Sequence, residues 1–184
     1  MLFSPGWRAP VRQGEILAVF TAGLLIGGTL SAAVIWLLSG FSAPLPTSVR
    51  TAAILGIAAL GTAREFGLLS LPLPQNARQI PQEVLQTNLR RGTLQFGFEL
   101  GTGVRTYVSS TAPYVLALAL LLSHEPLTTA LLTGTAFALG RALSATLTYL
   151  SQDDARDAAI ATRMPAIKTT TALTTLSALT LLAL

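Results

Sequence analysis

Five apolar stretches, each long enough to cross a bilayer as a helix, constrain this chain more than any other feature. A hydrocarbon layer about 30 Å thick needs about 20 helical residues. The 184-residue chain is 51% hydrophobic and only 11% charged, whereas a soluble domain is about 25% charged. We therefore expect an all-α fold, a polytopic membrane helical bundle in which residues 1–184 form one membrane domain. The five predicted transmembrane helices cover residues 15–38, 48–69, 94–122, 127–150 and 165–184.

Helices are the expected spanning form, because backbone groups in lipid must hydrogen-bond within their own segment. The alternation that marks membrane β-strands is not visible. The first stretch follows Arg8 and Arg12, as in a signal peptide. Its length of about 23 residues exceeds the apolar region of a signal peptide, and no convincing cleavage site follows it. The pattern predicts a retained signal-anchor helix.

The basic residues predict the orientation. Eight lie in the arm 1–13, the loop 74–93 and the connection up to Lys168, against one, Arg50, on the opposite side. The positive-inside rule then places the N-terminus in the cytoplasm and the C-terminus outside an inner (cell) membrane. The net charge of +4 is spread between apolar runs, so nucleic-acid binding is not expected. The loop 74–93 fits either an amphipathic helix on the cytoplasmic surface or a solvated linker.

Two internal patterns bear on the organisation of the chain. A shift of 78 residues aligns residues 14–63 with 92–141, for example Gly23 with Gly101. Either a tandem two-helix repeat or chance similarity in a chain rich in Ala, Leu, Thr and Gly explains these matches. The connection 151–164 resembles a polar helical extension of the fourth stretch.

Small residues at a spacing of four recur in four stretches. That spacing puts them on one helix stripe, so that two backbones can approach closely. We expect them to pack helices within the bundle, with homodimerisation as the alternative. The predicted packing glycines are Gly23, Gly27, Gly97, Gly101, Gly56 and Gly134.

Charged residues inside the apolar stretches are expensive in lipid and are usually paired or turned toward water. Arg64, Glu65 and Arg141 are predicted to form an intramembrane charge network, in which Glu65 pairs with Arg141. Glu99 is expected to pair with Arg64 or Arg141. The alternatives are charges that only set the helix register, or arginines that extend to the interface.

The third stretch is unusually polar in its middle. Pro113 removes a backbone donor and favours a kink there, and hydroxyl groups can satisfy the backbone groups that a kink releases. A broken, hydroxyl-lined helix with an arginine near the midplane suits a small anion or zwitterion, and a kinked packing helix has the same pattern. The residues of this candidate substrate-binding site are Arg105, Thr106, Ser109, Ser110 and Glu99.

Catalysis finds little support. Cysteine is absent and His124 is the single histidine, so thiol chemistry and histidine-based metal sites are not expected. Ser109 and Ser110 lack a visible base. We expect neither an enzyme nor a bound metal or cofactor.

The run Gly97-Phe98-Glu99-Leu100-Gly101 through Thr111-Ala112-Pro113-Tyr114-Val115-Leu116 resembles the opening helix of the transmembrane electron-transfer proteins of cytochrome c biogenesis. That group is similar to small exporters of the lysine-exporter kind. The resemblance covers 20 of 184 residues, and Ala112 stands where the group has a redox cysteine. It implies a transporter-like scaffold without thiol transfer, and no functional residue is carried over.

The leading hypothesis is a membrane protein that moves a small polar or anionic solute, with Arg105 holding the charge. The alternative is a non-catalytic membrane subunit that packs against a larger complex. Five helices enclose a thin pathway, so either function implies a homo-oligomer or a larger membrane-protein partner in the lipid bilayer.

Overall fold

The computed structural model describes residues 13–70, 72–73, 89–103, 110–151 and 154–183. Over these residues the chain forms helices and no strands, which confirms the all-α prediction for the described part. The helices are α1 (Gln13–Ser39), η3 (Gly40–Ser42, a 3-10 turn), α2 (Thr47–Glu65), α4 (Leu89–Thr102), α5 (Ala112–Ser123), α6 (Leu127–Ser151) and α7 (Asp154–Ala183).

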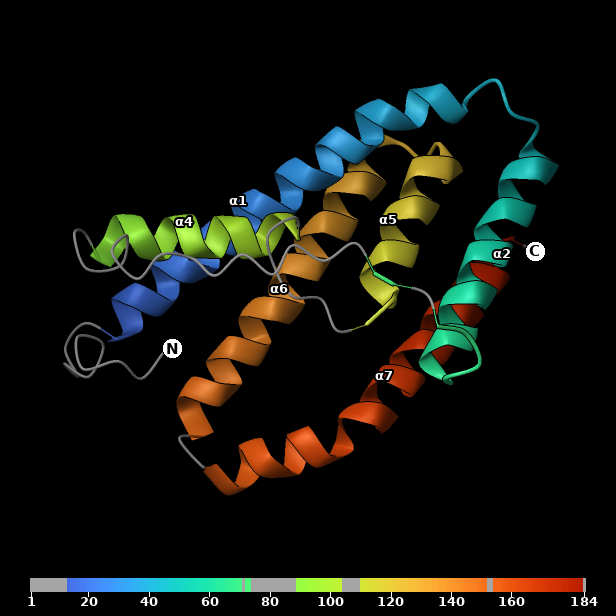
Figure 1. The fold of residues 1–184 in the computed structure, drawn as a ribbon. Coiled ribbons are helices and arrows are strands. Elements are labelled where there is room, and N and C mark those ends of the chain that lie inside the picture. Colours follow the sequence, from blue (N-terminus) through green and yellow to red (C-terminus); the bar gives the residue numbers. More distant parts are fainter. Residues whose placement is uncertain (1–12, 71, 74–88, 104–109, 152–153, 184) are drawn as a thin grey trace.

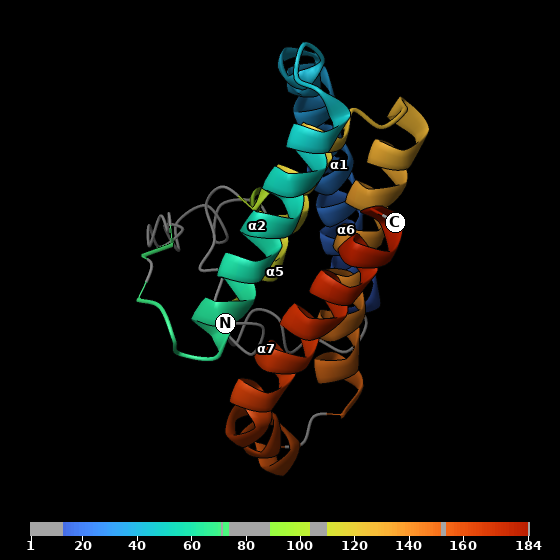
Figure 2. The same ribbon diagram turned by 90° about the vertical axis from the view of Figure 1, so that its right-hand side faces the viewer.

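The helices pack in two groups that share α5. Helix α1 packs along α4 and α6, whereas α2 packs along α5 and α7 (Figure 1). Helix α5 also contacts α1 and η3, so it links the two groups. Figure 2 shows α2 and α7 side by side, with α1 and α6 behind them.

The contacts between neighbours set the helix directions. Gly97 lies against Phe20 and Gly101 against Leu24, so α1 and α4 are parallel. Helices α1 and α6 are antiparallel, because successive α1 residues, Gly28 and Ala32, meet α6 at Ala138 and Ala130 in reverse order. Helices α2 and α5 are also antiparallel, with the start of α2 beside the end of α5 and the end of α2 beside the start of α5.

The third apolar stretch forms two helices instead of the single kinked span predicted over 94–122. Helix α4 ends at Thr102, and Gly103 follows with φ of +69°, a left-handed conformation that glycine adopts without steric cost. Helix α5 begins at Ala112 with Pro113 in its first turn. Proline is favoured there, because the first amides of a helix have no intrahelical acceptor. Pro113 therefore starts a helix and does not kink one.

The last stretch also differs from its prediction. Helix α7 begins at Asp154, so the residues predicted to extend the fourth helix belong to the start of the fifth. Pro165 lies inside α7, and Figure 1 shows the helix changing direction along its course, as expected where proline removes a backbone hydrogen bond. The arm 1–12 and residues 74–88 lie outside the described part of the chain. The 78-residue repeat stays a prediction.

Two described helices are long and apolar enough to cross a membrane, over Gly14–Ser42 and Leu127–Leu147. The remaining spans of the predicted five stay predictions. The first of the two, α1, contributes much of the packed interior. Phe20 and Leu24 cluster with Ala138 and Ala142 of α6, and the Phe20 ring stacks on Phe96 of α4 with centroids 5.6 Å apart.

Candidate functional site at the break in the third stretch

Glycines hold α4 against α1 through direct backbone contact. A Cβ atom added to Gly23 would collide with the Leu94 carbonyl oxygen, and one added to Gly97 would collide with the Phe20 carbonyl oxygen. Gly27 and Gly101 are equally crowded, one turn further along. The four-residue spacing thus places two predicted glycine pairs face to face on parallel helices, the arrangement that small residues permit.

A second stripe of α1 packs on α6. A Cβ atom on Gly28 would lie 2.7 Å from the Gly134 carbonyl oxygen and 3.0 Å from the Ala138 Cβ atom. The predicted packing residue Gly134 therefore has Gly28 as its partner. The predicted packing residue Gly56 is different, because no atom lies within 4 Å of where its Cβ atom would be. Ala52, the other small residue of its motif on α2, is exposed as well.

Glu65 joins the end of α2 to the start of α5. Its Oε1 atom accepts hydrogen bonds from the Thr111 backbone amide at 2.7 Å and from the Thr111 hydroxyl at 2.9 Å. The same oxygen lies 3.5 Å from Nη1 of Arg64. The Glu65 side chain is only 4% exposed. A carboxylate buried this completely is tolerated because hydrogen bonds and a cation satisfy it.

The first backbone donors of α5 are all accounted for. Glu65 accepts from the Thr111 amide, and the Ser110 hydroxyl oxygen accepts from the Ala112 amide at 3.3 Å. Pro113 has no amide hydrogen, and the Tyr114 and Val115 amides donate to the Thr111 carbonyl. The free backbone amides at a helix end need such hydrogen-bond acceptors when the surroundings are apolar. Loss of the Glu65 acceptor would cost about 1–3 kcal/mol, and its negative charge also suits a helix N-terminus.

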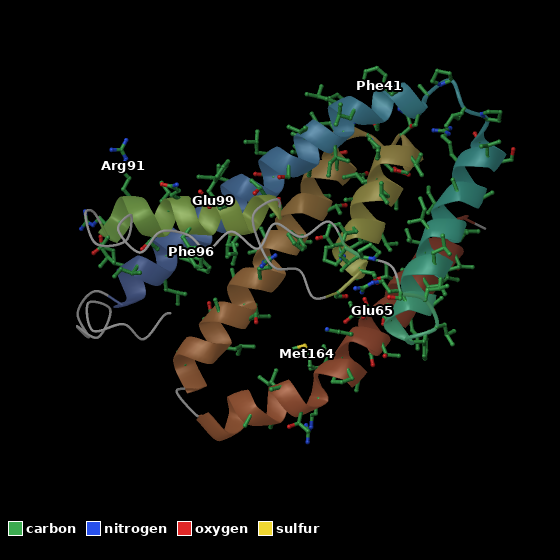
Figure 3. The ribbon with its side chains drawn as sticks, in the orientation of Figure 1. Phe41, Glu65, Arg91, Phe96, Glu99 and Met164 are labelled. Carbon is green, nitrogen blue, oxygen red and sulfur yellow. The ribbon has the colours of Figure 1, made fainter. Side chains whose placement is uncertain are left out.

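The predicted charge network takes a different form in the structure. Arg64 and Glu65 are close to each other, but the ion pairs found among the described residues do not include the predicted Glu65–Arg141 pair. Arg141 lies over the ring of Phe137, one turn earlier on α6, at 5.6 Å. Glu99 accepts a hydrogen bond from Gln95 at 3.0 Å. Figure 3 shows Glu99 on α4, well apart from Glu65. The charged residues are thus dispersed over three helices, because their helices do not all adjoin.

The predicted substrate-binding residues are only partly described. Arg105, Thr106 and Ser109 lie outside the described residues. Ser110 is half-buried just before α5, where its hydroxyl oxygen accepts a hydrogen bond from the Ala112 amide. Glu99 is one turn before the end of α4. Described residues therefore flank the break on both sides, and Glu65 contacts Thr111 across helices at its α5 end.

Several contacts were not predicted from the sequence. Thr111 had a recognisable signal, because a threonine shortly before a proline is a helix-start pattern. Gly28 lay beside a predicted glycine but outside the four-residue motif. Glu15 pairs with Arg90 at 2.6 Å, and this pair follows only from knowing that α1 and α4 start side by side.

The Glu15–Arg90 pair predicts a small effect on stability. Its side chains are 42% and 73% exposed, and solvent-exposed ion pairs contribute about 0–1 kcal/mol. We expect Arg90→Ala to lower the free energy of unfolding by less than about 1 kcal/mol, measured by denaturant titration in detergent. A double-mutant cycle with Glu15→Ala isolates the pair, and a coupling energy well above that range would contradict the expectation.

Comparisons with protein-family models, curated proteins and solved structures find no match for this chain. The resemblance of the third stretch to the cytochrome c biogenesis group therefore stays a prediction. Among the described residues, no cluster of three or more Asp, Glu or His side chains is placed to hold a metal ion. The geometry of the break is thus the basis for a functional proposal.

Proposed function

We propose that the chain is a multi-pass membrane protein with about five spans, its N-terminus in the cytoplasm and its C-terminus outside. The main support is that α1 and α6 are apolar yet largely uncovered. Only 33% and 22% of the residues in their apolar stretches are buried within the chain, and Leu37 and Leu132 are 67% and 70% exposed. An apolar helix is normally covered by protein or by lipid, and protein covers little of these two.

The helix directions and the threonine hydroxyl groups agree with this proposal. Parallel α1 and α4, with antiparallel α6, match the directions that five alternating spans require. Threonine hydroxyls that donate to their own helix leave few unsatisfied polar groups for lipid. In α7 these hydroxyl groups belong to Thr171, Thr174, Thr175 and Thr180, each donating to the carbonyl four residues earlier at 2.8–2.9 Å.

The topology predicts which engineered cysteines are accessible from each side. The chain has no cysteine, so each single-cysteine variant carries one defined probe. We expect a membrane-impermeant maleimide to label Ala43→Cys in intact cells, and Ala159→Cys only after the membrane is opened. Both positions are exposed in the structure. Labelling of both from the same side would contradict the alternating arrangement.

We infer that the protein moves a small polar or anionic solute through the break in the third stretch. The observation that carries this inference is the division of that stretch into α4 and α5, with a buried carboxylate at the α5 end. Discontinuous helices frequently form the solute sites of membrane transporters. In this proposal Arg105 binds the solute's negative charge, and Thr106, Ser109 and Ser110 supply hydroxyl groups.

Flux through proteoliposomes tests transport directly. The purified chain is reconstituted and loaded with one probe at a time, namely an amino acid, a short carboxylate or inorganic phosphate. We expect release of at least one probe to exceed that from protein-free liposomes about tenfold, since open passage replaces the barrier that lipid presents to charge. Equal release of every probe with and without protein would refute the proposal.

A membrane subunit of a larger complex is the second candidate. Ile160, Met164 and Ile167 are exposed at helical spacing on α7, which is typical of a surface covered by a partner. Purification in mild detergent separates the two candidates. A larger membrane protein recovered at fixed stoichiometry would favour the subunit, whereas a lone chain or a homo-oligomer would favour transport.

A further inference from the structure

The two ends of α5 are held differently. At the end near Ser123, Leu120 packs with Ala32 of α1 and Ala130 of α6, and Arg50 donates a hydrogen bond to the Ser123 carbonyl at 3.4 Å. Three other helices therefore contact this end. The end that begins at Ala112 follows Ser110 and Thr111, which belong to no helix.

Residues in the last turns of α2 contact the Ala112 end. The Thr111 hydroxyl lies 3.1 Å from the Gly61 carbonyl and 2.9 Å from Glu65. A Cβ atom on Gly61 would lie 2.7 Å from Val115 Cγ2, so the two backbones approach closely one turn into α5. The Glu65 carboxylate also binds the backbone at the start of α5, because it accepts a hydrogen bond from the Thr111 amide.

We propose that Glu65 is a positioning residue that fixes the Ala112 end of α5 against α2. An aliphatic side chain at position 65 leaves the Thr111 amide without this acceptor, and a buried amide seeks another partner. The end of α5 then moves away from α2, while its Ser123 end stays in place. The consequence for solute passage rests on the proposed function, whereas the positioning of α5 does not.

A disulfide cross-link between α2 and α5 measures this positioning. In the cysteine-free chain, Gly61→Cys with Val115→Cys places two sulfur atoms at the contact, and the valine replacement removes the methyl group that would collide with the new Cβ atom. Disulfides need Cβ atoms about 3.5–4.5 Å apart. A control pair, Ala32→Cys with Ala130→Cys, joins two alanines of one packed cluster and reports on the α1–α6 contact, which Glu65 does not touch.

We expect Glu65→Ala to slow oxidative cross-linking of the α2–α5 pair about tenfold, the fold-change that corresponds to losing one buried acceptor. Glu65→Gln retains an acceptor oxygen and should restore most of the rate. The α1–α6 control pair should cross-link at the parent rate in both variants. Glu15→Ala, which removes a carboxylate far from α5, should leave both pairs unchanged.

An unchanged α2–α5 cross-linking rate in Glu65→Ala would overturn the proposal. If Glu65→Ala abolishes both cross-links, the variant has not folded, and Glu65→Asp decides instead. That variant keeps the negative charge but shortens the side chain by one methylene group, so slower α2–α5 cross-linking supports the positioning role and an unchanged rate refutes it. Solute flux through proteoliposomes that contain the parent chain is a separate measurement. Absence of flux in the parent chain refutes transport and leaves the cross-linking result standing.

Discussion

Replacing Gly97 by leucine should lower the free energy of unfolding by about 3 kcal/mol, the upper part of the range for overpacked interiors. The first added carbon atom already meets the Phe20 carbonyl oxygen. Backbone atoms cannot rotate away as a flexible side chain can, so α4 must move off α1 as a whole. The Phe20–Phe96 stacking and the facing Gly23 contact are lost with it. Thermal unfolding in detergent, followed by far-ultraviolet circular dichroism, measures the loss.

Gly56→Leu is the matched control for this prediction. The same substitution is made in another apolar helix, at a position with no atom within 4 Å of the added carbon. We expect no loss of stability and a gain of up to about 1 kcal/mol, because leucine favours a helix interior more than glycine does. A loss for Gly97→Leu no larger than that for Gly56→Leu would show that the α1–α4 backbone contact does not form in the folded protein.

The contrast between these two glycines shows how far sequence patterns can predict helix packing. A spacing of four places small residues on one stripe, and this was enough to select Gly23, Gly27, Gly97 and Gly101. The spacing does not say which stripe faces a neighbouring helix. Gly56 follows Ala52 at the same spacing but faces open space, because α2 turns other residues toward α5 and α7.

The candidate site shows a similar limit. The sequence shows which charged residues lie within the apolar stretches, and the length of these stretches predicts the helices. Partners depend on where each helix ends and which helix adjoins it. Glu65 has Thr111 as its partner because α2 ends at Glu65 and α5 starts beside it. The length of an apolar stretch predicts such helix ends only to within several residues. Pro113 was interpreted as a kink because the stretch is apolar on both sides, although a proline in a first helical turn has the same local sequence.

Arg105→Leu should reduce the flux of an anionic solute about 100-fold, since losing one partner of a desolvated charge pair costs about 3 kcal/mol and each 1.4 kcal/mol is tenfold. Arg105 lies in sequence between α4 and α5, the stretch through which the proposed function routes the solute. Arg105→Lys keeps the charge without the planar guanidinium group and should retain part of the flux. Arg163→Leu, at an exposed position of α7, serves as the control for a lost positive charge. Unchanged flux in folded Arg105→Leu would remove the arginine from the mechanism, whereas equal losses in both leucine variants would mean that the net positive charge of the chain, and not a solute site at the break, attracts the anion.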